Sequence, residues 1–159
     1  HADDNGELHM LGRYPAMLAP IVSGGKLLAI HRTYLGDGCK ADVPTPKKLT
    51  AASGPLAGAC IPLAVPRGGV LGIAEGIETA AAASLGSGMP VVAAYCANAL
   101  AGFAFPRGIE RLVIFADHDP AGQKAAAALA QRATRAGLIP KTLTPSKPGS
   151  DWADVWLEG

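Results

Sequence analysis

The fold is decided by the stretch Val113-Ile-Phe-Ala-Asp-His-Asp-Pro-Ala-Gly122. Its apolar, strand-forming residues end abruptly in two carboxylates, Asp117 and Asp119, and Pro120 then begins an alanine-rich helix. Because alternate residues of a strand face opposite sides, both aspartates should lie on one face at its carboxyl end. Two hard oxygen ligands in that arrangement suit a Mg²⁺ ion.

A second strand pattern, Val70–Ala74, ends in Glu75 and precedes a helix pattern over Ile77–Leu85. In open α/β sheets, ligand sites gather beyond the carboxyl ends of parallel strands. We therefore expect Glu75 to converge with Asp117 and Asp119 on one metal ion.

Strand and helix patterns alternate from residue 68 onward, which predicts an α/β fold with about four parallel strands and helices on both faces. The further expected strands are Val91–Tyr95, Arg111–Ala116 and Lys141–Thr144, and the further expected helices are Asn98–Phe103 and Pro120–Arg135.

Residues 1–67 predict a small β-rich N-terminal subdomain, which lies beside or extends the main sheet of residues 68–159. Met17–Val22 and Lys26–Leu35 flank Ser23-Gly24-Gly25, which predicts a β-hairpin. The apolar run Ala57–Val65 could add a further strand.

Three segments, Gly72–Ala80, Ile114–Gly122 and Gly149–Asp154, together resemble the Toprim domain, in the version found in phage- and plasmid-type DNA primases and primase-helicases. The resemblance covers residues 68 to 158 and implies a Toprim-like (Rossmann-like) fold. It also implies that Glu75 is a general acid/base or metal ligand and that Asp117 and Asp119 bind the metal.

The resemblance extends to a later acidic motif, Asp151 with Asp154, which is less uniform in the family. Glu78 could hold a second ion together with Asp151, or it could be a first-turn acid favoured by the helix dipole. Asp119 could equally cap the helix that starts at Pro120. Capping leaves Asp117 without a role, so metal binding explains more of the pattern.

Net charge is only +1, but no Asp or Glu occurs between Val43 and Ala74. The family resemblance implies that Lys47 or Lys48 contacts a nucleotide or template phosphate, and Arg32 could also bind phosphate. A basic approach surface and an ordinary solvated face both explain these cations.

The composition excludes several classes of protein. With 49% hydrophobic and 17% charged residues the chain can bury a core, and its three cysteines indicate neither a disulfide framework nor a zinc site. No run approaches the roughly 18 apolar residues of a membrane span. We expect a cytoplasmic protein with no membrane association.

The resemblance implies the catalytic domain of a DNA primase. Its reaction would be Mg²⁺- or Mn²⁺-dependent transfer of nucleotides from nucleoside triphosphates into short primers on single-stranded DNA. A replicative helicase, in cis or in trans, is a further expected partner. Two alternatives stay open: a Toprim-type metal-dependent nuclease, because water can replace the attacking hydroxyl, and a non-catalytic module that binds DNA or a helicase.

Overall fold

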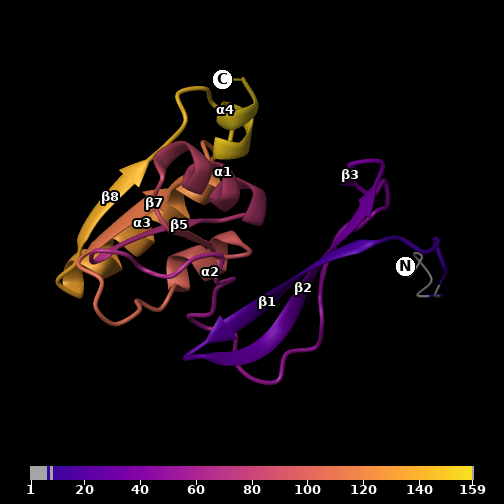
Figure 1. The fold of residues 1–159 in the computed structure, drawn as a ribbon, viewed down its shortest axis with the longest axis horizontal. Helices are drawn as coiled ribbons and strands as arrows, with labels where there is room; N and C mark the ends of the chain where they lie inside the picture. Colours follow the sequence, from indigo (N-terminus) through magenta and orange to yellow (C-terminus); the bar gives the residue numbers. More distant parts are fainter. Residues whose placement is uncertain (1–6, 8, 159) are drawn as a thin grey trace.

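The computed structural model describes residue 7 and residues 9–158, so part of the predicted N-terminal segment, residues 1–6 and 8, lies outside the described residues. An antiparallel N-terminal sheet forms an elongated arm beside a rounder body of parallel strands and helices (Figure 1). The arm consists of β1 (Ala16–Ser23), β2 (Lys26–Gly36), β3 (Cys39–Lys40) and β4 (Lys47–Leu49).

The body alternates strands and helices, as predicted, and its sheet has the order β6-β5-β7-β8 with every pair parallel. The prediction of an α/β fold with four parallel strands, preceded by a β-rich segment, is confirmed. Its elements are β5 (Val70–Ala74), α1 (Ile77–Ser87), β6 (Val91–Ala93), α2 (Ala97–Gly102), β7 (Arg111–Phe115), α3 (Pro120–Arg135), β8 (Ile139–Leu143) and α4 (Trp152–Glu158).

Strands β5 and β7 end at the same level. Ala74 pairs with Phe115 at the carboxyl end of the parallel ladder, and Ala74 also pairs with Ala93 of β6. The residues that follow these strands, Glu75 and Asp117, therefore emerge at one edge of the sheet.

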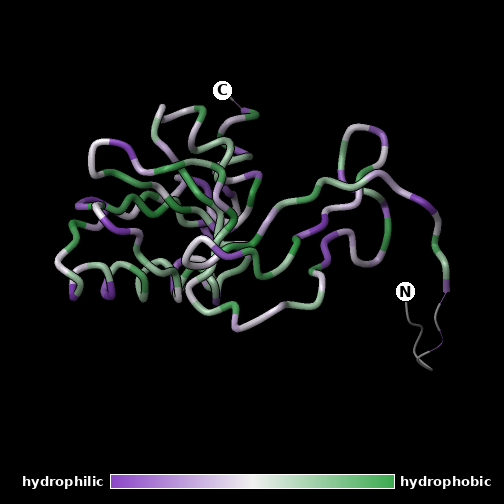
Figure 2. Tube along the Cα trace, turned by 60° about the horizontal axis from the view of Figure 1, so that its bottom comes forward, coloured by the Kyte–Doolittle hydropathy of each residue, from purple (hydrophilic) through white to green (hydrophobic). Residues whose placement is uncertain are grey.

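Two cores lie on opposite faces of the parallel sheet. On one face, α2 and α3 pack Leu100, Phe103 and Leu129 against buried residues of β5 and β7. On the other face, α1 packs together with Ile21 and Ala29 of the arm. The arm and the body therefore share a core, and Figure 2 shows apolar segments of the arm running into the body.

The predicted strand over Ala57–Val65 is wrong. Only two isolated bridges form there: Cys60 pairs with Val22 of β1, and Ile61 pairs with Ala93 of β6. Gly58 has a φ of +76° and Pro62 has no backbone N–H, so a regular ladder cannot propagate through this run. The run instead links the arm to the body, with one bridge to each.

Across the described part of the chain, no helix has both the length and the apolar character needed to cross a membrane.

Gly72 in β5 provides a stability test. A Cβ at this position would lie 2.8 Å from Val91 Cγ2 and 3.0 Å from Phe115 Cε2. We expect Gly72→Ala to lower the free energy of unfolding by about 1–3 kcal/mol, because the sheet must shift to make room. Urea denaturation measures the change. Gly102→Ala, where a Cβ meets no atom within 4 Å, is the matched control and should be neutral; equal losses in both variants would contradict this account.

Candidate metal centre

Five carboxylates gather at the carboxyl edge of the parallel sheet. Glu75 follows β5, Asp117 and Asp119 follow β7, and Asp151 and Asp154 lie at the start of α4. The negative charges of the other four all act on Asp117. The structure thus brings together the residues that the sequence predicted from three separate segments.

Asp117 is half-buried at the centre of this group. Burial, followed by the charges of Glu75, Asp151, Asp119 and Asp154, raises the pKa of the Asp117 carboxyl to about 7. Its Oδ1 is buried and accepts no hydrogen bond from the described part of the chain. Burying a carboxylate oxygen without a partner costs folding free energy. A bound proton or a bound cation at this atom would remove that cost.

Asp119 caps α3, as the alternative interpretation of the sequence proposed. Its Oδ1 accepts a 2.7 Å hydrogen bond from the N–H of Gly122, and Pro120 occupies the first turn. The cap fixes the Asp119 side chain at the site and occupies one of its oxygens. A Cβ at Gly122 would lie 3.0 Å from the carbonyl oxygen of Asp117, so glycine allows the start of α3 to approach the motif.

Asp151 and Asp154 cap α4 reciprocally. Asp151 Oδ1 accepts from the N–H groups of Ala153 (2.7 Å) and Asp154 (3.0 Å), while Asp154 Oδ2 accepts from the N–H of Asp151 (3.0 Å). The hydroxyl of Thr79 on α1 donates to Asp151 Oδ2 at 3.3 Å. These bonds hold Asp151 near Asp117. Sequence reasoning missed Thr79, because nothing in its pattern distinguishes it from an ordinary helix residue.

His118 anchors the loop that carries Asp151. Its N–H donates to the carbonyl of Ser150 at 2.9 Å, its carbonyl accepts from Gly149 at 2.8 Å, and its Nδ1 lies 2.8 Å from the carbonyl oxygen of Pro145. The ring is therefore engaged with the loop, and its role is structural.

Glu75 is half-buried beside the aspartates. Burial, followed by the charge of Asp119, raises the pKa of its carboxyl. A hydrogen bond from the N–H of Ala97 and the charge of Lys47 oppose that rise. Lys47 thus reaches the acidic site from the N-terminal sheet.

Glu78 is held by two lysines of the arm. Its Oε1 lies 3.0 Å from Lys40 Nζ and 3.2 Å from Lys47 Nζ. Burial alone would raise the pKa of the Glu78 carboxyl. Hydrogen bonds from its own backbone N–H and from Lys40, together with the charges of both lysines, outweigh burial and lower this pKa to about 2. Lys40 was not among the predicted site residues, because only the fold carries it to α1.

The three predicted phosphate-binding cations lie on different faces of the arm. In β4, Lys47 pairs with Thr33 and Lys48 pairs with Arg32, so consecutive lysines point to opposite sides of the sheet. Lys47 faces the acidic site. Lys48 and Arg32 share the outer face, away from it.

The residues fit a divalent metal ion in their chemistry. No three His, Cys, Asp or Glu side chains within residues 7 and 9–158 are already arranged to hold a metal by themselves. Mg²⁺ commonly binds through one or two carboxylates, several waters and substrate phosphates, so a complete protein cage is not required. The unpartnered Oδ1 of Asp117 and the surrounding negative charge are what such an ion would satisfy.

Comparisons with known proteins agree with this geometry. The sequence profile of the Toprim domain matches residues 70–159, and that of a domain of unknown function (DUF7146) matches residues 2–62. No curated protein sequence gives a significant match.

Among solved structures, a DNA primase domain from Pseudomonas aeruginosa has a TM-score of 0.60 at 17% identity, covering 98% of this chain and 50% of that one. The primase fragment of the bacteriophage T7 primase-helicase protein has a TM-score of 0.61 at 19% identity, covering 89% of this chain and 58% of that one. A DnaG primase catalytic domain bound to single-stranded DNA has a TM-score of 0.63 at 16% identity, covering 99% of this chain and 53% of that one.

At these identities the structures establish a shared fold, and the chain spans 50% to 58% of the length of the three. The family profile, in contrast, covers more than half of the chain and includes all five carboxylates. This chain belongs to the Toprim domain family.

Proposed function

We propose that the chain is the catalytic domain of a DNA primase, which makes short primers on single-stranded DNA from nucleoside triphosphates. The observation that carries the proposal is the buried, unpartnered Oδ1 of Asp117 among four further carboxylates, with lysines of a second sheet beside them. The fold shared with DNA primase domains supports it.

In this proposal Asp117, Asp119 and Glu75 hold the catalytic Mg²⁺ or Mn²⁺. When bound, the ion neutralises triphosphate charge and lowers the pKa of the attacking 3′-hydroxyl. Asp151 and Glu78 belong to a second site, and Glu78 can take part only after it releases its lysines.

Lys47 has the role of a phosphate-binding residue. Its ammonium group lies 3.2 Å from Glu78, and its charge acts on Glu75. A triphosphate entering between the arm and the sheet edge can replace Glu78 as the partner of Lys47 and Lys40. These two cations suit a triphosphate, which carries more negative charge than a single phosphodiester of DNA.

The partners follow from this reaction. Single-stranded DNA is the template and nucleoside triphosphates are the substrates. Because one structure with this fold is part of a primase-helicase protein, we include a replicative helicase, in cis or in trans, as a partner. A cytoplasmic location stays a prediction.

The first test removes the central carboxylate. Asp117→Asn keeps the shape of the side chain but not its charge, so Mn²⁺ binding measured by calorimetry should be lost. Primer synthesis on single-stranded DNA should fall on the order of 10²–10³-fold. Asp42→Asn, which removes an exposed carboxylate outside the site, is the control and should retain both. Metal-dependent shortening of DNA by the wild type would favour the nuclease, and DNA binding without metal uptake would favour the non-catalytic module.

The second test uses pH. With a pKa of about 7, Asp117 is mostly protonated below pH 7 and ionised above it, and a metal ion must displace that proton. Mn²⁺ affinity should therefore rise between pH 5.5 and 7, by up to about tenfold per pH unit, and level off at higher pH. Calorimetry across this range measures it. An affinity that stays constant with pH would show that the Asp117 proton does not compete with the metal.

The third test separates nucleotide binding from chemistry. Lys47→Met should raise KM for nucleoside triphosphates about tenfold or more, because a charge-assisted contact to phosphate is lost. Lys26→Met, which removes an exposed lysine at the start of β2, should leave KM unchanged. A fall in kcat with normal KM would contradict a binding role for Lys47.

A further inference from the structure

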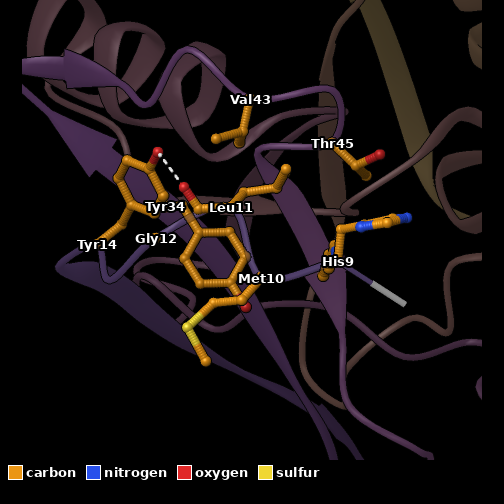
Figure 3. Close-up of a pocket in the computed structure, with 9 residues that line it drawn as sticks. His9, Met10, Leu11, Gly12, Tyr14, Tyr34, Val43 and Thr45 are labelled. Atoms are coloured by element: carbon orange, nitrogen blue, oxygen red, sulfur yellow. Dashed lines mark hydrogen bonds between the residues drawn. The ribbon is translucent and has the colours of Figure 1, made fainter. Parts of the chain in front are cut away.

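A pocket that Lys48 and Tyr34 help to line lies on the outer face of the arm (Figure 3). Because Lys47 and Lys48 point to opposite sides of the sheet and Lys47 binds Glu78, this face lies away from the carboxylates. The volume of the pocket is about 230 Å³, below the 300–1,000 Å³ range typical of pockets for larger ligands, so it suits one small ring system. The residues that line it include Met10, Gly12, Tyr14, Tyr34 and Lys48.

Two tyrosines form one side of the pocket, and His9 and Thr45 lie on the other (Figure 3). The Tyr14 hydroxyl donates to the carbonyl of Leu11 at 3.4 Å, which closes a short turn. Gly12 in that turn has a φ of +148°, and a Cβ there would lie 3.1 Å from Tyr14 Cε2. Glycine thus lets the segment before β1 fold against the ring, next to Tyr34.

Positive charge borders the aromatic side. Lys48 lines the pocket, and it pairs across the sheet with Arg32, which lies two residues before Tyr34 on the same face of β2. Within the described residues, Nε of Arg32 is buried and donates no hydrogen bond. The outer face therefore carries an aromatic ring for stacking, a lysine, and an arginine whose buried Nε has no hydrogen-bond partner within the described residues.

An aromatic platform beside aligned cations is the combination that holds single-stranded nucleic acid, with bases stacking on the rings and phosphates meeting the cations. We propose that this pocket binds one base of a single DNA strand on Tyr34, with the adjoining phosphates at Lys48 and Arg32. The inference rests on the proposed function in taking that strand to be the template. Alternation along β4 then assigns Lys47 to the nucleotide and Lys48 to the template, on opposite faces of one sheet.

The test is fluorescence anisotropy of a labelled single-stranded oligonucleotide in EDTA, so that binding is measured without catalysis. Tyr34→Leu should raise Kd about tenfold, because base stacking is lost, while Tyr34→Phe should bind like the wild type. Lys48→Met should weaken binding and reduce the slope of log K against log salt by about 0.7, as expected for one lost phosphate contact. Lys26→Met is the charge-matched control, and circular dichroism checks that each variant is folded.

An unchanged Kd in both Tyr34→Leu and Lys48→Met would overturn the proposal. Equal weakening by Lys48→Met and Lys26→Met would also overturn it, because only overall charge would then matter. Competition by a free nucleoside monophosphate, with no effect of Tyr34→Leu on the oligonucleotide, would assign the pocket to a nucleotide instead. A wild type that binds DNA through Tyr34 but makes no primer would support this site and refute the proposed function.

Discussion

Parallel pairing of β5 with β7, in register up to Ala74 and Phe115, is the constraint on which the acidic site depends. It delivers Glu75 and Asp117 to one edge, where burial raises the pKa of both carboxyls; the charge of Asp119 adds to the rise at Glu75, and the charge of Glu75 adds to the rise at Asp117. Carboxylates placed elsewhere at this edge are compensated by the N–H groups of helix termini, but Asp117 Oδ1 is not. A group left unsatisfied while its neighbours are satisfied is typical of a site kept for function at the expense of stability.

Local signals made much of the fold predictable. The helix from Pro120 to Arg135 was predicted with its observed bounds, because Asp119 and Pro120 start it and a glycine follows its end. The run Ala57–Val65 was misjudged because its apolar composition resembles a strand, whereas its actual partners lie in two different sheets. Composition cannot reveal such pairing.

The site was predictable only where its residues end strands. Asp117 and Glu75 sit at such ends, so their convergence followed from the general geometry of parallel sheets. The separation of Lys47 from Lys48 could not be foreseen, because β4 has only three residues and its register with β2 sets their directions. Glu78 was predicted either to hold a second ion or to be a first-turn acid, and neither prediction could include the two lysines that the arm supplies from a distant segment.

The bonds between Glu78 and its two lysines join the arm to α1, yet they are weak enough to exchange. The side chains of Lys40, Lys47 and Glu78 are 47%, 41% and 36% exposed, and ion pairs in such settings contribute about 0–1 kcal/mol each. In the proposed reaction, a triphosphate, which carries several charges and more acceptor oxygens than one carboxylate, would displace Glu78 at little cost. The shared core around Ile21 and Ala29 keeps the two sheets together during that exchange. Under the proposed function, the lysines would therefore be held in position before a triphosphate arrives and would leave Glu78 when it does.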